Sequence, residues 1–435
     1  MNRLGRFTKT VFESIADAGE KFIDVTRLRG TPVQKLLELS YDLISRKGQA
    51  SGIALARQIV NRYGELKEQE KLEYFRELIK ITDIDIQEIK ERADELYKNP
   101  EPETRESLNK SLKTKCQKFF SRMNMAPNGT RAIVQLREDL LKFIPTFPEL
   151  KPLDVDLRML LTTWFNPGFL VLKKIDWDTE ASVLEKIIRY ETVHNIDNWN
   201  DLKQRLVNNR RCFAYFHPAL DDDPIIFVEV AFTKGIANNV QTILNGNNDS
   251  KPNTAIFYSI NNCQRGLKGI HLGNFLIKMV STEIVSEYHS IKTFSSLSPV
   301  TGFAKWLKTE LESNSSNLFE KDRELLKQSL EQGWQKNAKL SEQLKKPLMK
   351  ACAHYLINEK RKEKPLNSVA RFHFGNGAEL YRINWMGNNS AHGIADSFGI
   401  MVNYLYNLKT IESNHESYMI DGKLTISKSV KNLLY

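Results

Sequence analysis

The chain of 435 residues is 41% hydrophobic and 27% charged, with a formal net charge of +10. This length predicts two or three domains, and the composition is ordinary for a soluble globular protein. No apolar run reaches the roughly 18 residues of a membrane span, and the N-terminal residues lack the apolar stretch of a secretory signal. We therefore expect a cytoplasmic protein, with a short amphipathic presequence left open.

Cysteine spacing and charge narrow the function classes further. The four cysteines are far apart and form no CxxC pair, which argues against a zinc site and a disulfide-built fold. The positive charge fits general solubility, nucleic acid or a phosphorylated small ligand. Nucleic acid ranks last, because the basic residues are spread along the chain without an RNA-binding signature. The cysteines are Cys116, Cys212, Cys263 and Cys352.

The first part of the chain is predicted to be helical. The stretch VQKLLELSYDLISRKG, residues 33–48, places its apolar residues near helical spacing and stops at a glycine. Similar patterns occupy residues 52–81, 83–99 and 130–144. They predict an all-α N-terminal domain over residues 1–150, which contains no cluster of catalytic residue types.

After residue 150 the pattern alternates between strands and helices. RRCFAYFHP, PIIFVEVAFT, TAIFYSIN and IKTFSSLSPV are apolar and strand-like, and a helix is predicted over residues 273–288. This mixture predicts an α+β protein whose second domain, residues 151–435, is a mixed α/β catalytic domain. A charged stretch near residues 308–364 is expected to be a solvated helical insertion.

A glycine-rich turn follows the strand that contains TAIFYSIN. In CQRGLKGIHLGN, Gly266, Gly269 and Gly273 alternate with the cations Arg265 and Lys268 just before a helix. Glycine permits close backbone approach and converging N–H groups, and a helix N-terminus adds positive potential, so a pyrophosphate could bind here. The spacing is neither the Rossmann nor the Walker pattern. A plain structural turn stays an equal alternative at this point.

Longer motifs in chain order carry a resemblance to a known family. PIIFVEVAFTKGI, AIFYSINNCQRGLKGIHLGNFLIK, FSSLSPVTGFAKWL, VARFHFGNGAELYRINW and GIMVNYLYNL resemble malonyl-CoA decarboxylase, and the resemblance extends over about residues 120–420. The family resemblance implies a helical N-terminal domain joined to a GNAT acetyltransferase-like catalytic domain. It further implies a carboxy-lyase of fatty acid metabolism that converts malonyl-CoA to acetyl-CoA and CO2. No metal and no cofactor are implied, coenzyme A being part of the substrate, and a homotetramer is expected through the helical domain.

The resemblance also implies site residues. The catalytic pair carries over to Ser298 in FSSLSPVTGF and His373 in ARFHFGNGA, with His373 as proton donor and Ser298 orienting or accepting from the malonyl group. Taken alone, either residue could be structural. Ser259 is expected at the acyl end of the substrate and Tyr406 at the wall of the same pocket. The coenzyme A-binding residues are Arg265, Lys268, Gly269, Ile270, His271, Leu272, Gly273 and Asn274.

Two further residues bear on the expected site: one differs from the family pattern, and the other is a carboxylate that we leave out of the site. His271 stands where the family often has a glutamate within the glycine turn. Glu229, within PIIFVEVAFT, is expected to face solvent, because burying an unpaired carboxylate between valines is costly. Two other functions stay open: a coenzyme A-dependent acyltransferase, which requires an acceptor, and a non-catalytic acyl-CoA-binding scaffold.

Overall fold

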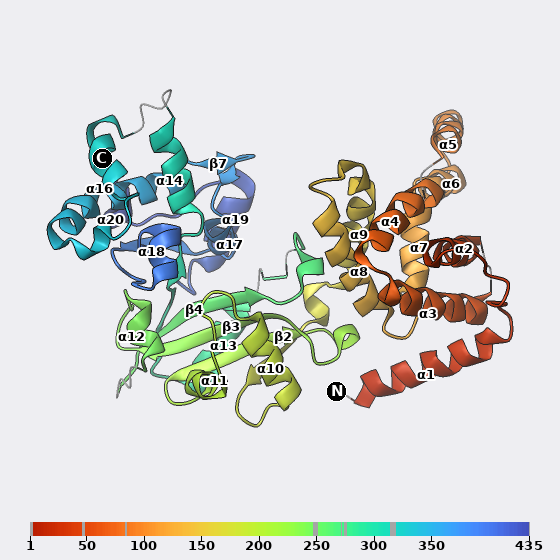
Figure 1. Ribbon diagram of the computed structural model, residues 1–435, viewed down its shortest axis with the longest axis horizontal. Helices are drawn as coiled ribbons and strands as arrows, with labels where there is room; N and C mark the ends of the chain where they lie inside the picture. The colour runs from red at the N-terminus through yellow and green to blue at the C-terminus, as the bar shows by residue number, and fades with distance from the viewer. Residues whose placement is uncertain are drawn as a thin grey trace. The chain divides into compact units, whose positions relative to one another are not determined.

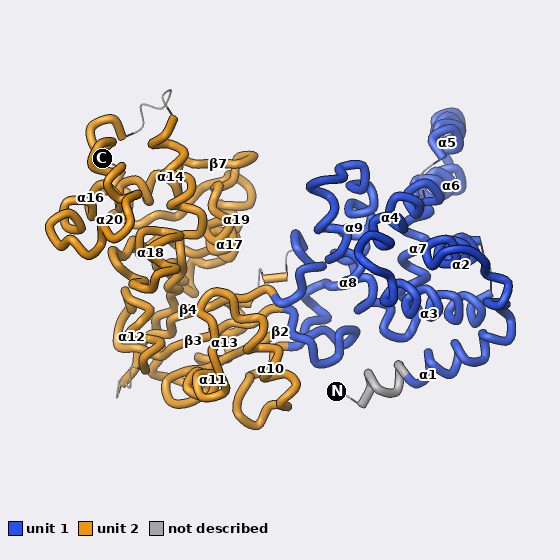
Figure 2. Tube along the Cα trace, viewed as in Figure 1, with its two compact units in different colours: residues 1–171, 216–225, 263–271 blue, residues 172–215, 226–262, 272–435 orange. Residues whose placement is uncertain are grey.

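The computed structural model describes residues 3–45, 48–82, 85–246, 251–270, 272–273, 276–313 and 319–434. Figure 2 shows that the chain forms two compact units. Unit 1 comprises residues 1–171, 216–225 and 263–271, and unit 2 comprises residues 172–215, 226–262 and 272–435. The domain boundary expected at residue 150 stays a prediction. Two later segments of the chain, one of which contains part of the glycine turn, belong to unit 1.

Unit 1 is helical, as the apolar spacing predicts. An aromatic cluster of Tyr63, Tyr74 and Phe75, with ring centroids 5.9 to 6.2 Å apart, fills its core. The elements, labelled in Figure 1 where there is room, are α1 (Arg3–Glu20), α2 (Pro32–Ser45), α3 (Gln49–Glu65), α4 (Glu68–Thr82), α5 (Ile86–Lys98), α6 (Pro102–Ser111), α7 (Lys115–Met123), α8 (Gly129–Phe143) and α9 (Lys151–Trp164), with short 3-10 helices η1 (Pro148–Leu150), η2 (Pro167–Phe169), η3 (Pro218–Leu220) and η4 (Arg265–Leu267).

A mixed sheet forms the centre of unit 2. In the described residues its strand order is β1-β2-β3-β4-β5-β10-β6, and β9 also pairs with β10. The β4–β5 pair is parallel, whereas β10 runs antiparallel to β5, β6 and β9. The strands are β1 (Val171–Ile175), β2 (Arg210–Phe216), β3 (Pro224–Thr233), β4 (Thr254–Asn262), β5 (Thr293–Ser296), β6 (Ser298–Pro299), β9 (Glu379–Asn384) and β10 (Met401–Tyr406); β7 (Lys360–Arg361) and β8 (Lys364–Pro365) pair separately.

Helices complete unit 2, and the prediction of a helical domain followed by a mixed α/β domain is confirmed. The helices from α14 onward belong to the last third of the chain, and Figure 1 shows them together as one group, coloured blue-green to blue. The helices are α10 (Ala181–Tyr190), α11 (Trp199–Leu206), α12 (Val240–Leu244), α13 (Leu276–Glu287), α14 (Phe303–Glu312), α15 (Arg323–Gln328), α16 (Ala338–Ile357), α17 (Ser368–Gly375), α18 (Ala391–Ser397), α19 (Ile411–Asp421) and α20 (Lys428–Lys431), with η5 (Glu320–Asp322) and η6 (Trp334–Lys336).

The described residues of the charged stretch near residues 308–364 are mainly helical, but they are not wholly solvated. The helix α16 buries one face, which includes Leu344, Leu348, Cys352 and Leu356. Its apolar residues recur at spacings of four, so the buried face belongs to the core of unit 2, while the lysines and the single glutamate of α16 lie outside that face. The expectation of a solvated insertion is therefore wrong for this face. No helix in the described part of the chain is long and apolar enough to cross a membrane.

Candidate active site

Ser298, His373 and Tyr406 lie together in unit 2. The Nε2 atom of His373 is 2.8 Å from Ser298 Oγ, and its Nδ1 atom is 2.5 Å from Tyr406 Oη. These partners are 75 and 33 residues from His373 along the chain. The fold thus joins three residues that the sequence motifs suggested separately.

Strand register and a capped helix explain this meeting. In β10, Val402 pairs with Ser298 of β6, and Tyr406 pairs with Phe294 of β5. Because side chains alternate along a strand, Tyr406 lies on the same face of β10 as Val402, and so on the face of Ser298. His373 comes from α17, whose first turn is held by Asn367: its side-chain oxygen accepts a hydrogen bond of 2.8 Å from the Ala370 amide.

The hydrogen bonds of the cluster form a directional chain. Ser298 donates its hydroxyl proton to Ser296 Oγ over 2.9 Å, so Ser298 must accept from His373. His373 therefore carries its proton on Nε2, and its Nδ1 accepts from the hydroxyl of Tyr406. The Tyr404 amide completes the chain by donating to Ser296 Oγ over 3.3 Å. The side chains are consequently ordered before any substrate is present.

The cluster is closed to water. His373 is 1% exposed and Tyr406 is 2% exposed, and the ring of Tyr404 stacks on the imidazole at 4.2 Å between centroids. Burial lowers the pKa of His373 from 6.5 to about 3, because the desolvated imidazolium is disfavoured. Burial also raises the pKa of the Tyr406 hydroxyl well above 10. Both groups are therefore neutral at pH 7 in the protein without substrate.

Ser259 has its own buried partners. Its hydroxyl donates to Glu191 Oε2 over 2.7 Å, and the Asn261 amide donates to the same oxygen over 2.8 Å. The other oxygen of Glu191 accepts from the amides of Val193 and His194 at 2.7 and 2.8 Å. Ser259 and the cluster around His373 make no hydrogen bond with one another in the described part of the chain. Its position at the acyl end of the substrate stays a prediction.

Glu229 is fully buried, so the expectation that it faces solvent is wrong. All of β3 is buried, and Glu229 pairs with Ser259 across β3 and β4. Arg205, itself 3% exposed, donates from Nη1 to Glu229 Oε2 over 3.1 Å. Burial and the nearby Glu191 carboxylate raise the pKa of Glu229 to about 8, while Arg205 opposes this rise. A buried partner, which local sequence does not reveal, offsets part of the cost of burial.

The first half of the glycine turn belongs to unit 1 and packs on α8. A side chain at Gly266 would lie 1.9 Å from the Val134 carbonyl oxygen, so only glycine fits there. The carbonyl of Gly266 accepts a hydrogen bond of 2.6 Å from Arg137 Nη1. Gly269 has a φ of +82°, which favours glycine. Arg265 and Lys268 are exposed, so their charges are open to solvent or ligand.

The second half of the turn belongs to unit 2. Leu272 is buried, and a side chain at Gly273 would lie 2.6 Å from a ring carbon of Phe372, the neighbour of His373. A glycine at this position therefore lets the turn pack closely against α17, and a larger residue would displace the ring of Phe372. Ile270 is half-buried in unit 1, and the predicted binding residues His271 and Asn274 lie outside the described residues.

Sequence reasoning missed several members of these clusters. Ser296 stands two residues before Ser298 in the SSLSP motif, so strand alternation could have found it. Tyr404 could have been found by the same rule from Tyr406. Glu191 follows α10 in an irregular segment and carries no local signal. No group of three or more His, Cys, Asp or Glu side chains in the described chain could hold a metal ion.

Comparison with family models covers most of the chain. The model described as malonyl-CoA decarboxylase C-terminal domain matches residues 168–435, and the corresponding N-terminal domain matches residues 83–165. The mitochondrial malonyl-CoA decarboxylase of Anser anser anser is 39% identical over 341 residues, which is 72% of this chain and 68% of the relative. That of Rattus norvegicus is 37% identical over 345 residues, 73% of this chain and 70% of the relative.

Solved structures agree with these matches. The crystal structure of malonyl-CoA decarboxylase from Rhodopseudomonas palustris is similar with a TM-score of 0.88 and 41% identity, covering 93% of this chain and 100% of that one. The enzyme from Agrobacterium vitis is similar with a TM-score of 0.86 and 38% identity, covering 92% of this chain and 99% of that one.

Proposed function

The chain belongs to the malonyl-CoA decarboxylase family and has the activity of a carboxy-lyase on malonyl-CoA, and we propose that Ser298, His373 and Tyr406 carry out its chemical step. The observation that carries this proposal is the buried hydrogen-bond chain in which His373 lies between the two hydroxyl groups. The match to the family covers the whole segment in which these residues stand.

The reaction defines what the residues must do. Decarboxylation breaks the bond between the α-carbon and the carboxylate carbon, and the electron pair moves onto the thioester as an enolate while CO2 leaves. The α-carbon then takes a proton, so malonyl-CoA and one proton give acetyl-CoA and CO2. Rate is gained by stabilising charge on the thioester oxygen, excluding water and supplying that proton.

His373 is proposed to supply the proton, although burial keeps its imidazole neutral before substrate binds. A malonyl carboxylate close to the imidazole raises the pKa of His373, because an opposite charge favours the imidazolium form. The proton is thus taken up with the substrate and passes from Nε2 to the α-carbon, after which the ring is neutral again. The Tyr406 hydroxyl donates to the neutral Nδ1 and can turn to accept from the protonated one.

Ser298 is proposed to hold the malonyl group. Its oxygen lies 2.8 Å from Nε2 of His373. When the hydroxyl turns from Ser296 to donate to the substrate, the group that accepts from it is therefore placed next to the proton donor. This places the malonyl group close to the reacting nitrogen. Neither a metal nor another cofactor takes part in the proposed mechanism.

The glycine turn is proposed to bind the phosphates of coenzyme A. Support comes from the exposed cations Arg265 and Lys268 beside the left-handed Gly269 and from the backbone of Ile270, Leu272 and Gly273. His271 and Asn274, which complete the turn, are included on the family resemblance alone. Replacing both cations by alanine is expected to weaken binding of coenzyme A more than binding of dephosphorylated pantetheine. Equal losses for the two ligands would remove the cations from the phosphate site.

The mechanism is tested with purified protein and malonyl-CoA alone, followed by mass spectrometry. Acetyl-CoA is expected without an acceptor, whereas consumption only after an acceptor is added would indicate an acyltransferase. His373→Ala is expected to lower kcat about 100- to 10,000-fold, the usual contribution of general acid catalysis, with coenzyme A affinity unchanged. A wild-type rate in this variant would show that His373 is not the proton donor.

We also propose a homo-oligomer that forms through the helical unit. Support comes from apolar side chains exposed on α5, with Ile86 at 73% and Tyr97 at 89% exposure. Light scattering of the purified protein would test the expected tetramer, and a monomer at micromolar concentration would contradict it. A cytoplasmic location, a role in fatty acid metabolism and the absence of a nucleic-acid partner stay predictions.

A further inference from the structure

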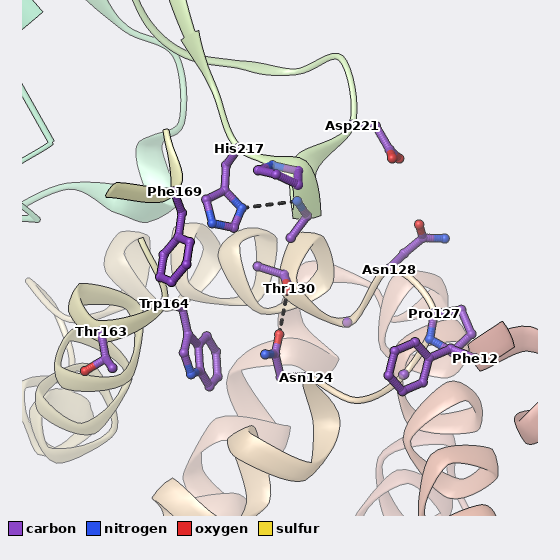
Figure 3. A pocket seen from close by; sticks show the side chains of 14 residues that line it. Phe12, Asn124, Pro127, Asn128, Thr130, Thr163, Trp164, Phe169, His217 and Asp221 are labelled. Carbon is purple, nitrogen blue, oxygen red and sulfur yellow. Dashed lines mark hydrogen bonds between the residues drawn. The ribbon is translucent and has the colours of Figure 1, made fainter. Parts of the chain in front are cut away.

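Unit 1 contains a cavity that the proposed chemistry does not use. It has a volume of about 620 Å³, within the roughly 300 to 1,000 Å³ typical of small-molecule sites. Figure 3 shows side chains from α1, α8 and α9, and from the segments around Asn124, Phe169 and His217, converging on it. Every residue that lines it belongs to unit 1. Its volume is therefore sufficient for a small-molecule group.

Aromatic rings form one wall of the cavity. Trp164, Phe169 and His217 lie along it in Figure 3, and the imidazole of His217 packs against Phe165 at 4.6 Å between centroids. His217 is fixed, because its Nδ1 accepts a hydrogen bond of 3.1 Å from the Ala219 amide. Burial also lowers the pKa of His217, so the ring is neutral at pH 7. A wall of neutral rings suits a flat aromatic ligand that can stack.

Two side-chain amides lie at the edge of the same cavity. Asn128 precedes α8 with a φ of +59°, and its side chain does not cap the helix. Asn124 accepts from Thr130 through its Oδ1 over 2.6 Å, which fixes the orientation of its amide group. An asparagine amide can both donate to and accept from the edge of an adenine ring. The cavity therefore combines a stacking wall with groups that recognise a purine.

The helix α8 links this cavity to the glycine turn. Gly129, at the start of α8, lines the cavity, while Val134 and Arg137 further along hold Gly266 of the turn. At about 1.5 Å per residue, the two places are separated by about 8 to 12 Å along the helix. A ribose is the only group that must span this distance between an adenine ring and a pyrophosphate.

We propose that this cavity in the helical unit binds the adenine base of the coenzyme A substrate. The proposal rests on the proposed phosphate-binding role of the glycine turn, and it gives the helical unit a direct part in substrate binding. The adenine ring stacks on Phe169 and Trp164, and the amides of Asn124 and Asn128 contact its edge. The base takes no part in the chemical step, so its contacts affect binding alone.

Two substrates test the proposal: malonyl-CoA, and malonyl-phosphopantetheine, which lacks the adenosine part. Phe169 is 60% exposed, so Phe169→Ala is expected to fold. It should raise KM for malonyl-CoA about 5- to 150-fold, the range for loss of one base stack, with kcat unchanged and the kinetics of malonyl-phosphopantetheine unaffected. Thr163→Trp, which fills the cavity, should act in the same way. Phe22→Ala, at a phenylalanine 67% exposed outside the cavity, should change neither substrate.

The outcomes separate this proposal from the proposed function. Equal kcat/KM for the two substrates in the wild-type protein, or equal losses for both in Phe169→Ala, would overturn the adenine site while leaving the decarboxylase intact. If neither substrate is turned over, calorimetry with adenosine 3′,5′-bisphosphate decides: weaker binding to Phe169→Ala than to Phe22→Ala supports the site, and equal binding overturns it.

Discussion

Removing the hydroxyl of Tyr406 isolates the hydrogen bond that orients His373. Tyr406→Phe keeps the aromatic ring but removes the hydroxyl that lies 2.5 Å from Nδ1 of His373. The buried Nδ1 atom then loses this hydrogen-bond partner. An unsatisfied buried polar atom costs about 1 to 3 kcal/mol. If this cost falls on the transition state, kcat should drop roughly 5- to 150-fold at about 1.4 kcal/mol per decade. Steady-state kinetics with malonyl-CoA measures this drop.

A matched variant separates orientation from packing. Tyr404→Phe also removes a hydroxyl beside His373, but Tyr404 contacts the imidazole by stacking and makes no hydrogen bond to it. We expect kcat of Tyr404→Phe to stay within about twofold of wild type, because the stacked ring remains. Equal losses of kcat in both variants, or no loss in Tyr406→Phe, would refute the assignment of Tyr406 as the residue that holds Nδ1.

Three further predictions concern protons and buried charge. Ser298→Ala is chosen to slow turnover, so that the binding of malonyl-CoA can be measured. Binding of malonyl-CoA should take up about one proton and binding of acetyl-CoA none, as measured by calorimetry in buffers of different ionisation enthalpy. Equal uptake with the two ligands would contradict the proposed proton source. Burial lowers the pKa of His373 to about 3 and of His194 to about 4. Below about pH 6.5 the unfolded chain binds protons that the native state does not. The free energy of unfolding is therefore highest above pH 6.5 and falls towards pH 4 by at most about 1.4 kcal/mol per pH unit for each histidine. Urea unfolding at pH 7 and 5 should show this fall, and an unchanged free energy of unfolding would contradict it. Glu191→Gln turns an NH2 group towards the donors Ser259 and Asn261. It should lower the free energy of unfolding by about 1 to 3 kcal/mol, because donors then face a donor. Urea titration measures this loss, and an unchanged midpoint would disprove it.

Local patterns predicted the elements well, because they depend on neighbours in the chain. The apolar spacing of the first 150 residues and the apolar strands after residue 200 reflect periodicities that persist in the fold. The strand alternation in β10 even implies that Tyr404 and Tyr406 share a face. What the pattern could not predict is the burial of α16, since its charged outer face dominates the composition of that stretch.

Long-range contacts set the limit of prediction for the site. The glycine turn was interpreted as a phosphate cradle, yet Gly266 is also required for packing on α8, against a segment about 129 residues earlier. Gly273 likewise packs closely against the ring of Phe372, about 99 residues later in the chain. Glu229 was assigned to solvent because its partner Arg205 lies 24 residues away on another element. In each case the missing information was the identity of a distant neighbour.

The neutrality of the cluster around His373 follows from the charge of the substrate. A permanently charged imidazolium in this buried position would require a carboxylate of the protein beside it, and that carboxylate would repel the malonyl group. The cluster instead surrounds His373 with two hydroxyl groups and a stacked ring, so the substrate itself is the first negative charge to reach the site. In the proposed mechanism, the negative charge moves to the enolate when CO2 leaves and disappears on protonation, and the imidazolium loses its partner at the same moment. The buried site then favours the neutral ring again, which drives the proton onto carbon and leaves no charge to retain acetyl-CoA.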